Sequence, residues 1–229
     1  MPPDFDWQCI DTVLLDMDGT LLDLAFDSQF WLQDVPFALS QQRGIPLDNA
    51  RQLIHDEYLA VQHTMNWYCF DYWRERLDLD IYQMTTHIGK NARLRDDTLP
   101  FLDHLRESGR QTILLTNAHP HSLSVKIEHT GLDKHLDLLL STHTFGYPKE
   151  DQRLWSAVQQ QTGFNPDRTL FVDDGEPILN AAKTFGIRYC LGIENPDSTM
   201  ANKSFEGHPS INDYRSLLPA IHPVTGPAK

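Results

Sequence analysis

Residues 12–20 read TVLLDMDGT and join a short run rich in Leu and Val to two acids. Such a run favours a buried strand. Asp16 and Asp18 follow where the strand would end, and Gly19 tolerates a turn that would point both carboxylates into one site. Carboxylate oxygens also suit Mg²⁺. The segment predicts a strand that ends at a functional site, although an Asp-Gly turn that merely closes a strand explains it equally well on its own.

Further apolar runs along the chain predict a parallel sheet. They are continuous rather than alternating, as expected for strands covered on both faces. Helical patterns separate them, which is typical of βαβ units, and a glycine follows each of the last three helices. We therefore predict an α/β fold with a doubly wound parallel sheet. The expected strands are residues 12–16, 111–116, 136–140, 169–173 and, more weakly, 188–191; the expected helices are residues 99–107, 121–130, 151–162 and 177–185.

The chain between the first and second expected strands is far longer than one crossover helix requires. It contains four helical patterns. We therefore expect an α-helical cap at residues 23–96, inserted into a core formed by residues 1–22 and 97–229. The tail from Asn195 is rich in Pro, Ser and Asn, with one helix expected at residues 212–218. The four patterns in the cap are residues 27–43, 47–65, 67–77 and 81–88.

The composition argues against several classes of partner. The chain has 32 acidic and 19 basic residues, and its net charge of −13 would repel nucleic-acid polymers and anionic membranes. Its three cysteines are far apart and form no CxxC pair, which favours reduced thiols. No apolar run approaches the length of a membrane helix, and the N-terminus does not resemble a signal peptide. We expect a cytoplasmic protein, and the oligomeric state stays open.

Polar residues also follow the other expected strands. Thr116 and Asn117 precede a helix, where a hydroxyl and backbone N–H groups can bind phosphate. Lys149 precedes another helix, where the dipole does not favour a cation. Asp173 and Asp174 are adjacent and would repel each other without a cation nearby. Separately these residues are explained by a helix cap, a solvated lysine and a turn, but in a parallel sheet all would meet at one edge.

In type and order these residues resemble the four motifs of the haloacid dehalogenase superfamily. The resemblance implies a Mg²⁺-dependent phosphatase in which Asp16 forms an aspartyl phosphate and Asp18 is the acid/base. It further implies a helical cap between the first two motifs, and Ile178 departs from it where many relatives have a second acid. Phosphate ligands would be Thr116, Asn117 and Lys149, and metal ligands Asp16, the Asp18 carbonyl, Asp174 and Asp173.

Segments such as LLDMDGTLLDLAFD and NWYCFDYW, spread over residues 14–192, are similar to bacterial 5′-nucleotidases of this superfamily. That similarity implies a small phosphate ester as substrate, namely a purine nucleoside monophosphate, GMP or IMP. A phosphatase or phosphomutase for sugar phosphates stays an alternative, as does a binding protein without catalysis. Asp18 argues against a haloacid dehalogenase. A phosphonatase needs a lysine in the cap, where Lys90 stands alone near the end.

Aromatic residues are dense in the expected cap, and one of them could stack on a purine. A role in the core of the cap itself is the stronger interpretation for most of them. The histidines near the motifs have no zinc-like spacing, so we expect them at the surface or in support of the site. The aromatic residues are Phe26, Phe30, Trp31, Trp67, Tyr68, Phe70, Tyr72 and Trp73, and the histidines are His119, His121 and His143.

Overall fold

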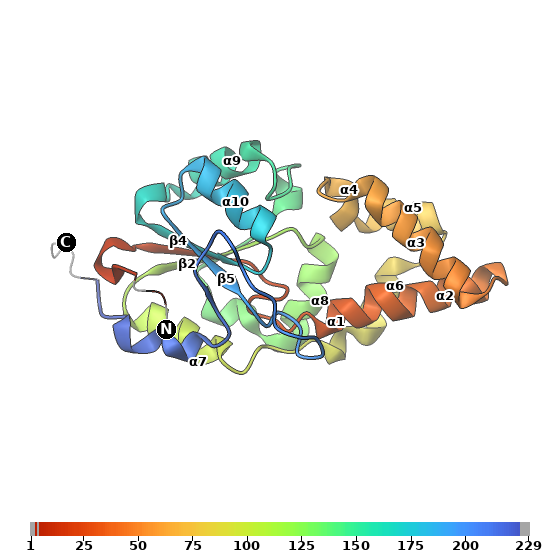
Figure 1. Ribbon diagram of the computed structural model, residues 1–229, viewed down its shortest axis with the longest axis horizontal. Helices are drawn as coiled ribbons and strands as arrows, with labels where there is room; N and C mark the ends of the chain where they lie inside the picture. The colour runs from red at the N-terminus through yellow and green to blue at the C-terminus, as the bar shows by residue number, and fades with distance from the viewer. Residues whose placement is uncertain (1–2, 4, 225–229) are drawn as a thin grey trace.

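The computed structural model describes residue 3 and residues 5–224, and these form an α/β core beside a bundle of helices (Figure 1). Within this described part the core sheet has six strands, all parallel, in the order β3-β2-β1-β4-β5-β6. The predicted doubly wound parallel sheet is therefore confirmed. The strands are β1 (Thr12–Leu15), β2 (Gln111–Thr116), β3 (Leu138–Ser141), β4 (Thr169–Asp173), β5 (Tyr189–Ile193) and β6 (Ser210–Ile211).

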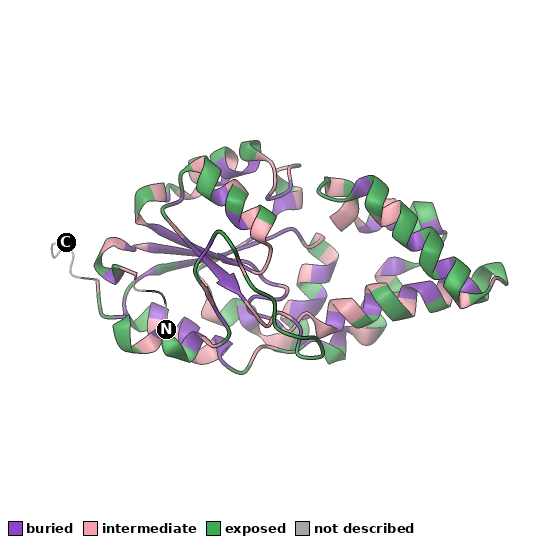
Figure 2. Cartoon of the chain, in the orientation of Figure 1, coloured by how far each residue is buried: buried purple, intermediate pink, exposed green. Residues whose placement is uncertain are grey.

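The strands are buried because helices cover both faces of the sheet (Figure 2). Val13 and Leu15 belong to one hydrophobic cluster and Leu14, between them, belongs to another, as the alternation of a strand requires. The helices α7 (Thr98–Glu107) and α8 (Pro120–Thr130) lie on one side of the sheet. On the other side lie α9 (Gln152–Thr162) and α10 (Glu176–Phe185) (Figure 1).

The chain between β1 and β2 forms a helical cap with a hydrophobic cluster of its own, centred on Trp73 and Phe30. The predicted helix 27–43 is instead two helices joined by a π-helical segment, Phe30–Asp34. The predicted helix 67–77 is broken at Cys69, whose backbone is extended. The cap helices are α1 (Ala25–Gln29), α2 (Val35–Arg43), α3 (Leu47–Val61), α4 (Met65–Tyr68), α5 (Phe70–Leu77) and α6 (Ile81–Ile88).

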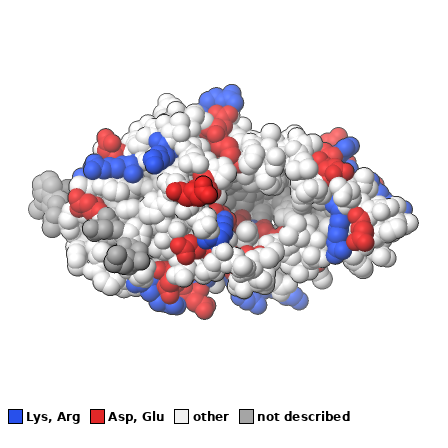
Figure 3. Space-filling model, in the orientation of Figure 1, with Lys and Arg blue, Asp and Glu red and all other residues white. Residues whose placement is uncertain are grey.

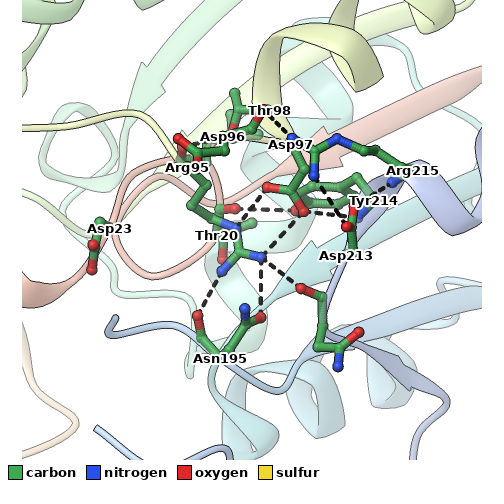
Figure 4. A network of polar contacts seen from close by, with 12 residues as sticks. Thr20, Asp23, Arg95, Asp96, Asp97, Thr98, Asn195, Asp213, Tyr214 and Arg215 are labelled. Atoms are coloured by element: carbon green, nitrogen blue, oxygen red, sulfur yellow. Dashed lines mark hydrogen bonds and ion pairs between the residues drawn. The ribbon is translucent and has the colours of Figure 1, made fainter. Parts of the chain in front are cut away.

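Two linkers join the cap to the core, and they run side by side. Leu22 and Leu94 form an antiparallel bridge between them. The Arg95 guanidinium, which is buried, donates to the Asp97 carboxylate at 3.2 Å and to the backbone oxygen of Asn195 at 2.6 Å (Figure 4). Asp97 in turn accepts from the Tyr214 amide at 2.8 Å. The second linker is thus fixed to the chain that follows β5.

The C-terminal region differs from the prediction. The helix expected at residues 212–218 is replaced by short 3-10 turns at Tyr214–Ser216 and Leu218–Ala220. Pro219 limits the length of a helix here, because it has no backbone N–H to donate to the carbonyl four residues before it. The two-residue strand β6 was not predicted, since so short a segment carries no hydrophobic pattern.

Among the helices in the described part of the chain, none combines the length and the apolar character that crossing a membrane requires.

Candidate active site

A cavity of about 520 Å³ lies between the carboxyl ends of the strands and the cap. In Figure 3 it opens as a hollow with acidic side chains at its rim on the side of the core. The residues predicted to carry chemistry line this one cavity, although they come from four separate parts of the chain. They are Asp16, Asp18, Thr116, Asn117, Lys149, Asp173 and Asp174.

Lys149 is buried and joins the first and last of these parts. Its ammonium donates to Asp16 Oδ1 at 2.5 Å and to Asp173 Oδ2 at 2.7 Å. Burial alone would lower the pKa of Lys149, but these two carboxylates raise it above its ordinary value. Burial raises the pKa of Asp16, and the Lys149 ammonium opposes this rise. A permanently charged lysine therefore favours the ionised form of Asp16, as a nucleophile requires.

Three carboxylates that could share a cation meet beside this lysine. One oxygen from each of Asp16, Asp173 and Asp174 lies within 4.8 Å of the others. Burial raises the pKa of Asp173 to about 8, and its acidic neighbours add to the rise against the pull of Lys149. Closely placed oxygen ligands that repel one another fit a divalent cation, which would relieve the repulsion. Asp174 also accepts from Lys203 at 2.9 Å.

Asp18 contacts a group that was not predicted. Lys126 of α8 donates to Asp18 Oδ1 at 2.7 Å and to both carboxylate oxygens of Asp27 at 2.8 Å. Burial and the negative charge of Asp27 raise the pKa of Asp18 to about 6, while Lys126 opposes them. Asp18 is therefore nearer to neutrality at physiological pH than an ordinary aspartate, as an acid/base group should be.

The segment expected to bind phosphate is held by hydrogen bonds at the end of β2. The Thr116 hydroxyl accepts from the Ala118 amide at 3.0 Å in the turn that precedes α8, whose N-cap is His119 rather than Thr116. The Asn117 side chain accepts from the Lys149 amide at 3.0 Å and donates to Glu150 at 3.2 Å. Glu150 also accepts from the Tyr68 hydroxyl of the cap at 2.9 Å. Glu150 thus connects this segment to the cap.

The cap aromatics have two roles. Phe30, Phe70 and Trp73 are buried in the hydrophobic cluster of the cap, as the stronger interpretation held. Phe70 also lines the cavity, together with Trp31, Trp67 and Tyr68. The cavity is thus lined both by aromatic side chains of the cap and by carboxylates of the core.

His119 is half-buried in the cavity wall and stacks on Phe70, with ring centroids 4.9 Å apart. Burial and the neighbouring His143 lower its pKa to about 4. The ring centroids of His143 and His119 are 5.0 Å apart. Nε2 of His121 lies 3.2 Å from the Tyr82 carbonyl oxygen, to which it can only donate, and 3.0 Å from the Thr86 hydroxyl. These histidines support the contact between core and cap rather than lying at the surface.

Comparison with known proteins identifies the family of the chain. Residues 10–186 match the family of haloacid dehalogenase-like hydrolases. The GMP/IMP nucleotidase YrfG of Escherichia coli (strain K12) is 63% identical over 215 residues, which cover 94% of this chain and 97% of that protein. The chain belongs to the haloacid dehalogenase-like hydrolases. The resemblance noted in the sequence is therefore confirmed.

Solved structures share the fold of this haloacid dehalogenase-like hydrolase. A haloacid dehalogenase-type phosphatase from Thermococcus onnurineus superposes with a TM-score of 0.77 at 22% identity, over 92% of this chain and 97% of that one. The L-2-haloacid dehalogenase of Xanthobacter autotrophicus gives a TM-score of 0.64 at 17% identity, over 93% and 98% of the two chains. Both include the helical insertion in the aligned length.

Sequence reasoning missed the charged residues that support the site of this hydrolase. Lys126 and Glu150 each contact a predicted site residue, and Asp27 contacts Lys126, but each of the three reads in the sequence as an ordinary solvated charge. Ser122 and Lys126, four residues apart, are both buried on α8, but neither residue type signals burial in a sequence. Ile178 lines the cavity where many relatives have an acid, and Asp173 lies in the carboxylate cluster.

Proposed function

We propose that this enzyme is a 5′-nucleotidase that hydrolyses the purine nucleoside monophosphates GMP and IMP. The observation that carries the proposal is the 63% identity with the GMP/IMP nucleotidase of Escherichia coli over nearly the full length of both chains. The cavity supports it, because it is lined both by a carboxylate cluster for phosphate chemistry and by aromatic side chains suited to a nucleobase.

The reaction proceeds in two steps on this chain's own residues. The Asp16 carboxylate attacks the substrate phosphorus and forms an aspartyl phosphate as the bond from phosphorus to the 5′ oxygen breaks. Asp18 donates its proton to the departing 5′ oxygen, which leaves as the nucleoside. Asp18 then takes a proton from the water that attacks the aspartyl phosphate. Inorganic phosphate leaves and both aspartates return to their starting states.

The charges around the substrate phosphate would be balanced by groups on three motifs. Thr116, the Asn117 amide and the Lys149 ammonium would bind the phosphate oxygens. Mg²⁺, the cofactor we propose, would be held by Asp16, Asp173, Asp174 and the Asp18 carbonyl, and when bound it offsets negative charge on the phosphate. The carboxylate oxygens of Asp16, Asp173 and Asp174 that lie within 4.8 Å of one another support these three side chains as ligands.

We place the reaction in the cytoplasm, where the three cysteines, which are free, would remain reduced. Free purine mononucleotides are the partners we propose.

Phosphate release from a substrate panel tests the proposed function. The panel contains GMP, IMP, AMP, pyrimidine monophosphates, sugar phosphates and FMN, each assayed with Mg²⁺ and with EDTA. We expect GMP and IMP to be hydrolysed with the highest kcat/KM and all activity to disappear in EDTA. Preference for a sugar phosphate would show that the substrate assignment is wrong but would leave the phosphatase mechanism unchanged. Full activity in EDTA would contradict the metal assignment.

A further inference from the structure

Lys126 is a lysine in an unusual place. Its side chain is 1% exposed, although lysine is among the residues least often fully buried. Its ammonium contacts the carboxylates of Asp18 and Asp27 and lies 5.4 Å from the ring centroid of Phe26. Burying a charge costs free energy unless partners compensate it, and two carboxylates and an aromatic face do so here. The arrangement fixes three charged groups in one geometry.

The contacts of Lys126 extend from the acid/base residue to the cap. Asp18 lies in the loop after β1, Lys126 on α8 of the core and Asp27 on the first cap helix. Asp18 and Asp27 line the cavity, whereas Lys126 is not among the residues that line it. Any effect of Lys126 on the reaction must therefore pass through one of the two aspartates. Asp18 is the one that the proposed mechanism uses.

We propose that Lys126, held by Asp27, positions Asp18 for proton transfer to the leaving 5′ oxygen. The inference rests on the proposed function. The ammonium bonds Oδ1 of Asp18, so the transferred proton is carried by Oδ2. That proton passes to the 5′ oxygen as its bond to phosphorus breaks, and Lys126 keeps all of its own protons. Lys126 is thus a positioning residue, and Asp27 makes its position depend on the cap.

A change of leaving atom separates this role from a purely structural one. GMP is compared with its analogue in which sulfur replaces the bridging 5′ oxygen, so that base, sugar and phosphate stay the same. A thiolate leaves without a proton far more readily than an alkoxide, because thiols are much stronger acids than alcohols. Loss of proton transfer should therefore lower the reaction rate on GMP but not on the sulfur analogue, whereas a distorted site should lower both rates.

The experiment measures single-turnover rates of nucleoside release, with the enzyme in saturating excess over the substrate, for Lys126→Met and Lys126→Gln. Lys134→Met, at an exposed lysine, is the control. We expect Lys126→Met to lower the single-turnover rate on GMP by about 10²-fold, since general acid catalysis contributes about 10²–10⁴-fold. The rate on the sulfur analogue should fall by less than about 10-fold. Lys126→Gln, which keeps a donor, guards against a Met variant that fails to fold. Asp27→Asn should show the same selectivity to a smaller degree.

Equal falls in rate on the two substrates, or weaker binding of GMP with its maximal single-turnover rate unchanged, would overturn the role of Lys126. A wild-type enzyme that does not hydrolyse GMP would refute the proposed substrate instead. The same comparison on phenyl phosphate and p-nitrophenyl phosphate, which differ in leaving group, would then decide the role of Lys126.

Discussion

Gly19 brings the loop after β1 against the proposed metal site. Its φ is +79°, and a β-carbon there would lie 2.9 Å from Cγ of Asp174 and from Cβ of Pro196. An L-residue would therefore be strained in its backbone and would also push on Asp174. Gly163 has a similar φ of +72° but open space around it. A substitution there therefore tests backbone strain without a steric clash.

Gly19→Ala should lower both stability and activity. We expect a loss of about 2–4 kcal/mol in the free energy of unfolding, which joins left-handed strain to a steric clash, and about 1–2 kcal/mol for Gly163→Ala from strain alone. Urea denaturation measures both values. Phosphate release should fall in Gly19→Ala and stay at the wild-type level in Gly163→Ala. Equal costs in the two variants would show that Asp174 does not constrain this position.

At single positions, the sequence predicted residues whose signal is local. Asp16, Thr116 and Asp173 each stand at or just after an apolar strand, Lys149 stands in the segment between β3 and α9, and the fold places all four on one cavity. Lys126 could not be predicted, because its partner Asp18 is 108 positions away and nothing beside it marks burial. The chemical roles of the site residues stay predictions.

At the scale of elements, the linkers depend on one buried ion pair. The side chains of Arg95 and Asp97 are 8% and 6% exposed. Arg95→Met would leave Asp97 buried with its negative charge unpaired, whereas Arg215 and Asp213 pair at the surface, 51% and 43% exposed. These two arginines lie close together in the same network (Figure 4). The same substitution at the two arginines therefore compares the loss of a buried ion pair with the loss of an exposed one.

We expect Arg95→Met to destabilise the protein by about 3–5 kcal/mol, since breaking a buried pair leaves an uncompensated charge. Arg215→Met should cost less than about 1 kcal/mol, as exposed pairs do. Chemical denaturation at neutral pH measures the two changes. A cost for Arg95→Met no larger than that for Arg215→Met would mean that the buried pair does not hold the linker.

Most core elements could be predicted because apolar runs and glycine stops mark them. The ends of cap helices could not: α3 was expected to reach residue 65 but stops at Val61, where Gln62 is extended and His63 has a φ of +65°. No residue type in that stretch signals such a conformation. Nothing in the sequence signals the break at Cys69 either, and Phe70 after it packs into the cap cluster. Tertiary packing decides these boundaries.

At the scale of the whole molecule, the core and the cap have separate hydrophobic clusters. Contacts between them include polar ones, from Lys126 to Asp27 and from Tyr68 to Glu150. We propose that residues 23–96 form one domain and residues 1–22 and 97–229 the other, since parts with their own cores can separate without exposing them. The proposed phosphate hydrolysis takes place in the cavity between these two parts.

Asp16→Asn tests whether Asp16 takes the phosphoryl group of GMP. The amide keeps the shape of the side chain but is a far weaker nucleophile than a carboxylate. Phosphate release from GMP is measured beside the exposed variant Asp167→Asn, and thermal unfolding of both checks the fold. We expect Asp16→Asn to fold but to release no phosphate, and Asp167→Asn to match the wild type. Sustained turnover by folded Asp16→Asn would show that Asp16 is not the nucleophile.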